Sequence, residues 1–303
     1  MRRRDLALLL CVVAAQPALA QTPEPAAPPS NTSRPHPEFL VSAAWLAAHL
    51  ESPDVVVLHV GRSDSAYREG HIPGARFLPL AAVATTVKGV PNEFPAWGYL
   101  VATFRDLGVG DRARIVIYGD DPGLLAARAW VALDILGQSG RTAVLDGGLT
   151  RWTAEHRPTE TTLNLSSMEP FTARRQDRVV TAAWVRSHLG DRSVILVDAR
   201  PADQFAAGHL PGAKSLFWVE NLVSRDDPVA KPPSTLQDEL WKGIGADAAN
   251  TVVTYCYTGM QASYDFFVAR YLGYGDVRLY DGSMAEWTSL TPAADYPVER
   301  SGP

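Results

Sequence analysis

The chain has 303 residues, of which 46% are hydrophobic and 20% charged, and its formal net charge at pH 7 is −5. This composition is typical of globular domains, and the length is sufficient for two of them. An acidic chain without clusters of Lys or Arg lacks the positive surface that nucleic acids require, so we expect no nucleic-acid partner.

The first twenty residues have the pattern of a secretory signal. Three arginines precede an apolar run from Leu6 to Ala15, and the segment ends in Ala-Leu-Ala at 18–20. The apolar run is too short to span a bilayer. Arg3 and Arg4 would also suit a twin-arginine signal, and the residues do not separate that export route from the general one. We predict a cleaved signal over 1–20 and an exported, periplasmic protein.

A proline-rich stretch follows the signal. Residues 21–37 read QTPEPAAPPSNTSRPHP, and we predict a disordered lead-in there. The signal carries three arginines and one aspartate, so its removal takes the formal net charge from −5 to about −7. No later stretch is long and apolar enough for a membrane span, and we expect none.

The two halves of the chain repeat each other. VVLHVGRSDSAYREGHIPGAR (56–76) matches ILVDARPADQFAAGHLPGAK (195–214), IVIYGDD (115–121) matches VVTYCYT (252–258), and VLDGGLTRW (144–152) matches LYDGSMAEW (279–287). The order is the same in both halves, and the matching positions lie 135 to 138 residues apart. A repeat of this length is a whole domain rather than a solenoid unit, so we predict a duplicated domain.

Short apolar runs alternate with amphipathic stretches in each copy. In the second copy we expect strands over Val194–Val197, Thr251–Tyr255 and Val277–Tyr280, and a helix over Gln261–Leu272. This alternation predicts an α/β fold in which helices cover both faces of a parallel sheet. The predicted boundaries are 38–157 for the first domain, 158–176 for a linker without a clear period, and 177–299 for the second domain.

Cys256 is one of only two cysteines, and it lies between a predicted strand and a predicted helix. Cys11 falls inside the predicted signal, so we expect Cys256 to be the only thiol of the mature chain. A lone thiol in an exported protein is buried and inert, pairs with another chain, or reacts. The first copy has Gly119 or Asp120 at this position, depending on one gap, and neither is a good nucleophile.

The position of Cys256 favours a reactive thiol. Ligands of parallel α/β domains lie beyond the carboxyl ends of the strands, and Cys256 directly follows a predicted strand. Gly259 allows a tight turn, so the backbone N–H groups of the loop can converge on the sulfur at the start of a helix. Both effects stabilise a thiolate, and we expect them to lower the pKa of Cys256.

These segments resemble the rhodanese family of sulfurtransferases over nearly the whole chain after the signal. The resemblance rests on the GHIPGA and GHLPGA segments, on DGG and DGS followed by Trp, and on the six-residue loop Cys256–Gln261 (CYTGMQ). In tandem members of the family the second domain is catalytic and the first has lost its cysteine, and this chain has the same asymmetry. The resemblance implies two tandem rhodanese-like domains, with Cys256 as the catalytic nucleophile of the second.

The family implies a ping-pong reaction without a metal or an organic cofactor. Cys256 attacks the outer sulfur of a donor such as thiosulfate, sulfite leaves, and the resulting persulfide passes its sulfur to cyanide or a thiol. A protein that accepts the persulfide is a further partner compatible with this chemistry. The alternative is an exported module that binds sulfur anions or carries a persulfide without turnover.

The residues around Cys256 leave the donor open between thiosulfate and 3-mercaptopyruvate. Familiar thiosulfate users carry Arg and Lys in the loop, familiar mercaptopyruvate users carry small neutral residues, and this loop matches neither. Arg200 matches a family arginine near the site, although an ion pair with Asp198 is the competing interpretation. Thiosulfate users often have a second arginine where this chain has Gln204. We assign substrate binding to Arg200 and to the loop residues Tyr257, Thr258, Gly259, Met260 and Gln261.

Other repeated residues are expected to be structural. His71 and His209 precede a turn in both copies, and Trp152 and Trp287 end a repeated segment, although only one copy has the thiol. Glu93–Trp97 (EFPAW) has no counterpart in the second copy, and we interpret it as a domain-interface loop. No cluster of His, Cys and Asp has the spacing of metal ligands, so we predict no metal site.

Phosphatases of related fold are a rival for the cysteine loop. Their loop is one residue longer and ends in an arginine six positions after the cysteine, where this chain has Ala262. No other nearby residue supplies the bidentate donor that a phosphoryl group requires, so sulfur transfer is the favoured chemistry. Because sites of tandem α/β proteins usually lie between the domains, we expect the Cys256 loop to face the domain interface.

Overall fold

The computed structural model describes residues 35–301. The predicted signal, residues 1–20, and residues 21–34 of the proline-rich stretch lie outside this range. The described end of that stretch leads into η1 (Pro37–Phe39), and the N–H of His36 donates to the carbonyl of Tyr271 at 2.7 Å. Among residues 35–301, no helix is both long and apolar enough to cross a membrane.

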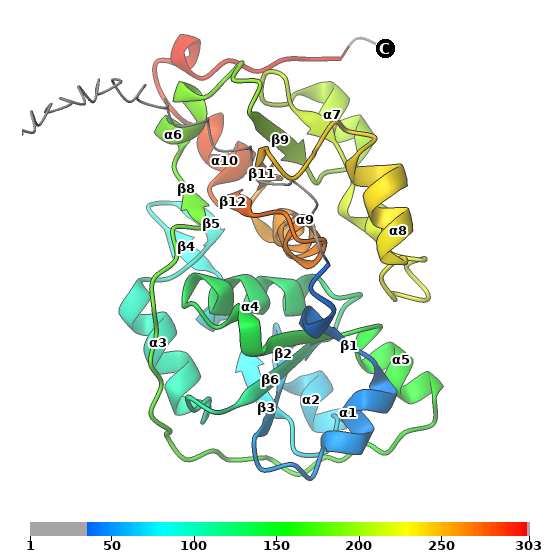
Figure 1. The fold of residues 1–303 in the computed structure, drawn as a ribbon. Coiled ribbons are helices and arrows are strands. Elements are labelled where there is room, and N and C mark those ends of the chain that lie inside the picture. Colours follow the sequence, from blue (N-terminus) through cyan, green and yellow to red (C-terminus); the bar gives the residue numbers. More distant parts are fainter. Residues whose placement is uncertain (1–34, 302–303) are drawn as a thin grey trace, which may run out of the picture. The chain divides into compact units, whose positions relative to one another are not determined.

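The first half of the described chain folds around a five-stranded parallel sheet (Figure 1). Its strand order is β1 (Leu40–Val41), β7 (Thr142–Leu145), β6 (Arg114–Gly119), β2 (Val55–Gly61) and β3 (Arg76–Pro79). One face is covered by α1 (Ala43–His49), α2 (Ser65–Glu69) and α5 (Gly148–Ala154), and the other by α3 (Trp97–Asp106) and α4 (Leu124–Ile135). An antiparallel hairpin of β4 (Thr85–Val87) and β5 (Val90–Glu93) follows the turn η2 (Leu80–Ala82).

The second half repeats this topology with a second five-stranded parallel sheet. Its order is β8 (Val179–Val180), β12 (Asp276–Tyr280), β11 (Thr251–Tyr255), β9 (Val194–Asp198) and β10 (Lys214–Ser215). One face is covered by α6 (Ala182–Ser187), α7 (Ala202–Ala207) and α10 (Ser283–Trp287), and the other by α8 (Pro233–Thr235), η5 (Leu236–Trp241) and α9 (Met260–Tyr271). The turns η3 (Ser139–Arg141), η4 (Trp218–Asn221) and η6 (Ala293–Asp295) complete the described chain. The equivalent strands have the same order in both sheets, which confirms the duplicated parallel α/β fold.

The elements predicted in the second copy are present, with boundaries that differ by at most one residue. Strand β11 occupies the predicted range Thr251–Tyr255, and β9 and β12 each extend one residue further. The run TVVTY is β-branched and aromatic, which suits a strand with both faces covered. Helix α9 begins one residue before the predicted range, directly after Gly259.

Helices α4 and α9 pack against each other and join the cores of the two halves. The ring of Trp130 in α4 meets that of Phe267 in α9 edge to face, with 5.1 Å between the ring centroids. All but the first residue of α4 are buried, so this helix needs cover on every side and receives it from its own sheet and from α9. This packing places the start of α9, which follows Cys256, against the first half.

The repeated histidines and tryptophans are structural, as predicted. The Nδ1–H of each histidine donates to the carbonyl four residues earlier, at 2.6 Å for His71 and 2.9 Å for His209. Each imidazole also stacks on the aromatic ring of that same earlier residue. Trp152 and Trp287 are fully buried, and each donates its Nε1–H to a proline carbonyl.

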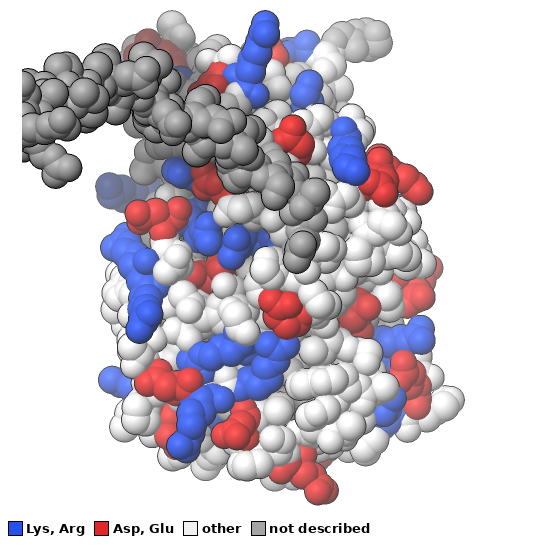
Figure 2. All heavy atoms as spheres, viewed as in Figure 1, with Lys and Arg blue, Asp and Glu red and all other residues white. Residues whose placement is uncertain are grey.

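Residues 158–176, the predicted linker, form no helix. Their one strand-type pairing is an isolated β-bridge between Glu160 and His71. On the face of the molecule shown in Figure 2, acidic and basic side chains are interspersed. That face therefore presents no large area of a single charge.

Candidate active site

Cys256 follows β11 at the carboxyl edge of the second sheet. The neighbouring strand β9 ends at Asp198, which lies opposite Tyr255 in the register of the two strands. Helix α9 begins directly after Gly259, whose φ is +78°. Glycine adopts this left-handed φ without strain, and a Cβ at this position would collide with the Asp281 carboxylate. The turn from the cysteine into the helix therefore requires glycine.

Backbone donors surround the sulfur of Cys256. The N–H groups of Thr258, Gln261 and Ala262 donate hydrogen bonds to it. Gln261 and Ala262 belong to the first turn of α9, so the sulfur also lies at the positive end of the helix dipole. The predicted convergence of loop N–H groups on the sulfur is confirmed.

The hydroxyl of Ser283 binds two backbone N–H groups of the cysteine loop, at Cys256 and Gly259. It accepts the N–H groups of Cys256 and Gly259, each at 3.1 Å, and donates to the carbonyl of Tyr280 at 2.8 Å. Ser283 is the serine of the repeated DGS segment, and its φ of +53° turns its side chain toward these groups. The DGS segment therefore supports the loop, a role that the repeat alone did not reveal.

Burial raises the pKa of the Cys256 thiol above its ordinary value. The side chain is 1% exposed, and the lost hydration of the thiolate outweighs the three loop N–H bonds. The carboxylate of Asp198 raises the pKa further. The expectation of a lowered pKa was therefore wrong, because the sequence reveals the loop donors but neither the depth of the thiol nor the neighbouring carboxylate.

Arg200 forms a buried ion pair with Asp198. Its Nη2 lies 2.6 Å from Oδ2 and its Nε lies 2.9 Å from Oδ1, and Nη2 also donates to the carbonyl of Gly208 at 2.6 Å. Arg200 is 5% exposed and close enough to Cys256 for their charges to interact. This geometry agrees with the second interpretation of Arg200, an ion pair that stabilises the second domain, rather than with a free cation at the site. A role of Arg200 toward the donor stays a prediction.

The other residues assigned to substrate binding take different positions. Tyr257 is 58% exposed beside the buried cysteine, which makes it the most exposed side chain of the loop. Thr258 and Gln261 contribute their N–H groups to the sulfur. The side chain of Met260 is buried in the core shared by α4 and α9, so only its backbone belongs to the loop.

The equivalent loop of the first half contains its own carboxylate. Oδ1 of Asp121 accepts the N–H groups of Gly123 and Leu125, each at 3.1 Å. Leu125 lies two residues after the glycine that precedes α4, as Gln261 lies two residues after the glycine that precedes α9. The N–H of Leu125 therefore corresponds to that of Gln261, which is one of the donors of the sulfur. Next to Asp121, Asp120 is hydrogen-bonded to Nε2 of the buried His59. The N–H in the first half that corresponds to a donor of the sulfur therefore already has an acceptor.

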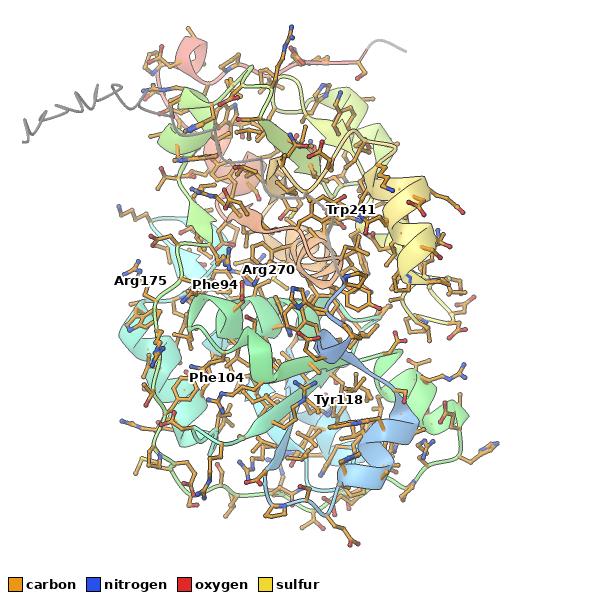
Figure 3. All side chains as sticks on the ribbon, in the orientation of Figure 1. Phe94, Phe104, Tyr118, Arg175, Trp241 and Arg270 are labelled. Atoms are coloured by element: carbon orange, nitrogen blue, oxygen red, sulfur yellow. The ribbon has the colours of Figure 1, made fainter. Side chains whose placement is uncertain are left out.

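Three residues of the first half bind the cysteine loop or Asp281, which packs against it. The side chain of Asn92 donates to Oγ1 of Thr258 at 3.0 Å, and the N–H of Phe94 donates to Asp281 at 2.7 Å. Arg128 binds the same Asp281 carboxylate at 2.6 Å. Phe94 is labelled in Figure 3 and belongs to the EFPAW segment, whose role as an interface loop is confirmed. Sequence reasoning missed Arg128, although a lone arginine within the apolar run LLAARAWVALDI was a signal.

A cavity of about 410 Å³ lies between the two halves, next to this support. Its lining includes Glu93 and Trp97 from the first half and Asp281 and Glu286 from the second. Burial raises the pKa of Glu93 to about 7, and the carboxylates of Asp281 and Glu286 contribute to the increase. Cys256 does not line the cavity. The cavity therefore lies beside Phe94 and Asp281, which support the loop, and not beside the thiol.

The chemistry available at this site is that of the thiol. In the part of the chain that the structure describes, no group of three or more His, Cys, Asp or Glu side chains could hold a metal ion. A thiolate is a strong nucleophile, and a ring of N–H donors can stabilise a sulfur anion bound to it. The arrangement suits the acceptance and release of a sulfur atom.

The comparisons with known proteins agree with this chemistry. The rhodanese-like domain matches residues 42–155 and again residues 181–290. The chain is 32% identical to a probable 3-mercaptopyruvate sulfurtransferase of Pseudomonas aeruginosa, over 82% of this chain and 94% of that protein. It is 31% identical to a thiosulfate sulfurtransferase of Azotobacter vinelandii, over 86% of this chain and 97% of that protein.

A solved structure shows the same fold. The crystal structure of a 3-mercaptopyruvate sulfotransferase from Escherichia coli matches with a TM-score of 0.72 at 26% identity, over 81% of this chain and 98% of that one. Both halves match one domain family, and the relatives are matched over nearly their whole length. The chain therefore belongs to the family of proteins with rhodanese-like domains, as a tandem-domain sulfurtransferase.

Proposed function

We propose that Cys256 is the nucleophile that carries the transferred sulfur. The observation that supports this most is the convergence of three backbone N–H groups on its sulfur at the start of α9. In the equivalent loop of the first half, the Asp121 carboxylate accepts the N–H of Leu125, the counterpart of Gln261. Cys256 is also the sole cysteine among residues 35–301.

The reaction has two half-reactions. The Cys256 thiolate, formed by loss of its proton to solvent, attacks the outer sulfur of the donor. With thiosulfate, the S–S bond of the donor breaks and sulfite leaves with the electron pair, so that Cys256 becomes a persulfide. Cyanide or a thiol then attacks the outer sulfur of the persulfide, and the Cys256 thiolate is restored. The loop N–H groups stabilise the negative sulfur in both half-reactions.

The donor is thiosulfate or a related compound such as 3-mercaptopyruvate, and relatives named for each support both. The loop has no cationic side chain to neutralise a dianion, and Arg200 is bound to Asp198. The backbone N–H groups and the helix end are therefore the main anion holders at the thiol. A panel of both donors, assayed with purified protein and with cyanide as the acceptor, decides between them.

Cys256→Ser tests the proposed nucleophile. We expect the variant to lose sulfur transfer and to keep its melting temperature within a few degrees, because a hydroxyl is a far weaker nucleophile toward sulfur at neutral pH. In the wild type, incubation with donor should add one sulfur atom to the peptide that contains Cys256, and cyanide should remove it. Substantial transfer by the serine variant would rule out this mechanism.

A carrier that does not turn over is the second candidate. The observation that favours it is the exposed ring of Tyr257 beside a thiol that is 1% exposed, because an aromatic side chain at the surface suits a protein acceptor better than a small one. Repeated turnover with a small acceptor such as cyanide supports the enzyme. A single transfer that continues only when a protein acceptor is added supports the carrier.

We also propose that the protein is exported to the periplasm. The support is the arginine-rich, apolar and small-residue pattern of residues 1–20. Cell fractionation, together with the N-terminal mass of the mature protein, tests this location. A cytoplasmic protein with an intact N-terminus would contradict it.

A further inference from the structure

Arg128 of α4 connects the first domain to the support of the cysteine loop. It is fully buried and binds Asp281 of the second domain twice, Nη1 to Oδ1 at 2.6 Å and Nη2 to Oδ2 at 3.1 Å. Its guanidinium also lies over the ring of Phe94, 3.5 Å from the ring centroid. A bidentate pair of this kind fixes the direction as well as the distance between its partners.

Asp281 passes this contact on to the loop. Its carboxylate packs against Gly259, where an added Cβ would collide with Oδ1. Two residues after Asp281, the hydroxyl of Ser283 accepts the N–H groups of Cys256 and Gly259. Nη1 of Arg128 also lies 3.3 Å from Oγ of Ser263, which donates to the carbonyl of Gly259 at 2.8 Å. Arg128 therefore contacts two side chains, Asp281 and Ser263, that lie against the turn at Gly259.

Asn92 forms a second connection between Arg128 and the loop. Nη2 of Arg128 donates to the carbonyl of Asn92, whose φ is +64°. Asparagine tolerates a left-handed φ better than most residues other than glycine, and the bond from Arg128 fixes the direction of its carbonyl. The side chain of Asn92 donates to Oγ1 of Thr258, and the N–H of Thr258 donates to the sulfur. Arg128 thus acts on two segments that hold the donors around Cys256.

We propose that Arg128 is a positioning residue for sulfur transfer, which holds the ring of backbone donors against the Cys256 sulfur from the other domain. It acts through Asp281 and Asn92 and not by contact with the sulfur. The domain without a nucleophile then sets the reactivity of the thiol in its neighbour. This inference rests on the proposed role of Cys256.

A second ion pair between the domains separates positioning from simple attachment. Asp134 lies in the last turn of α4. Its Oδ1 is 3.5 Å from Nη2 of Arg270 in α9, and its Oδ2 is 3.2 Å from Nε of Arg178. Figure 3 shows Arg270 beside α4, at the boundary with the second domain. The ion-pair partner of Arg270 and of Arg178 is Asp134, which lies outside the cysteine loop. If Arg128 did no more than attach the two domains, replacing Arg270 should change the reactivity of the Cys256 thiol as much as replacing Arg128 does.

The test compares the full chain with Arg128→Met, Asn92→Gly and Arg270→Met. The rate at which iodoacetamide alkylates Cys256 is measured against pH by peptide mass, so that Cys11 does not interfere. The midpoint of this profile reports the pKa of the thiol, and its plateau reports access to it. Melting temperature and the kinetics of sulfur transfer are measured on the same samples. Asp198 and Arg200, the charged groups that face Cys256, are unchanged in every variant.

For Arg128→Met we expect the midpoint to rise by about one pH unit, which leaves about tenfold less thiolate at a fixed pH below it. Asn92→Gly keeps the left-handed backbone and removes only the side-chain bond to Thr258. Because this variant leaves no buried charge unpaired, we expect its midpoint to rise by less than that of Arg128→Met. Arg270→Met should lower the melting temperature and leave the midpoint in place. For Arg128→Met, kcat should fall more than KM rises, because the donors act on the reacting sulfur.

An Arg128→Met profile equal to that of the wild type, or an equal rise in Arg270→Met, would overturn the proposal. If Arg128→Met does not fold, Asn92→Gly decides, and an unchanged midpoint in that variant rules the proposal out. The failure of the proposed nucleophile is a separate result. It would appear as sulfur transfer by Cys256→Ser, whatever the alkylation profiles show.

Discussion

Asp198 binds the guanidinium of Arg200 through both carboxylate oxygens, at 2.9 and 2.6 Å, at the edge of the sheet where Cys256 lies. Asp198 is fully buried and Arg200 is 5% exposed. The carboxylate raises the pKa of the thiol, after the larger effect of burial. Arg200 therefore compensates a negative charge that would otherwise act on the thiolate alone.

Arg200→Ala should lower the stability of the second domain rather than weaken donor binding alone. The variant leaves a buried carboxylate without its partner, and we expect the free energy of unfolding to fall by roughly 3–5 kcal/mol. Both half-reactions should slow together. Donor kinetics, cyanide kinetics on a preformed persulfide, and thermal melting are measured on the same variant. A raised KM for anionic donors with an unchanged melting temperature would instead assign Arg200 to donor binding.

Asp120→Ala in the first domain should change sulfur transfer little. Asp120 is the hydrogen-bond partner of His59, which is fully buried, so its loss leaves a polar ring without that bond. We expect a loss of about 1–3 kcal/mol in the free energy of unfolding, as for other unsatisfied buried groups, with kcat close to that of the wild type. A loss of activity as deep as that of Cys256→Ser would show that the first loop takes part in the chemistry.

Much of the fold could be predicted because its signals are local. Strand β11 has its predicted range because TVVTY is rich in β-branched residues and follows the polar Asn250, and the repeat predicted the same fold for both halves. The convergence of N–H groups on Cys256 also followed from local order, a strand, then Gly259, then a helix. The strand and the loop depend on neighbours within a few residues, and the repeat shows the same local signals twice.

The parts that sequence reasoning missed depend on contacts between distant segments. The raised pKa of Cys256 comes first from burial and also from Asp198 on another strand. Arg128 and Asp281 are 153 residues apart, and no period or motif connects them. The buried side chain of Met260 followed from the packing of α4 on α9, which the helical spacing of α9 does not specify.

Stability should depend on pH through Glu93 at the interdomain cavity. Its pKa is about 7 in the folded protein against an ordinary value of 4.5, because burial and the Asp281 and Glu286 carboxylates disfavour its charge. The folded protein therefore favours the protonated form of Glu93. The resulting stabilisation is fully present below the unfolded pKa of 4.5 and is lost as pH rises through about 7. Glu93→Gln should therefore melt close to the wild type near pH 4.5 and above it at pH 8. Glu51→Gln, at an exposed glutamate, is the control, and equal pH profiles for all three proteins would refute the prediction.

Ser283→Ala and Ser283→Gly should both weaken the cysteine loop. Each removes the hydroxyl that accepts the N–H groups of Cys256 and Gly259, and each buried N–H left without an acceptor costs about 1–3 kcal/mol. Alanine also keeps a side chain at φ +53°, which glycine tolerates better, so Ser283→Gly should melt above Ser283→Ala. If the hydroxyl positions the donors of the sulfur, sulfur transfer should fall by roughly tenfold in both variants, since about 1.4 kcal/mol lost at the transition state is a factor of ten. Ser289→Ala is the matched control, because that serine is exposed and bonds only the carbonyl of Glu286 at 2.7 Å. The contrary outcome is a rate of sulfur transfer that changes in parallel with the melting temperature and is close to that of the wild type in Ser283→Gly. It would mean that the backbone of the DGS segment matters and that the Ser283 hydroxyl does not.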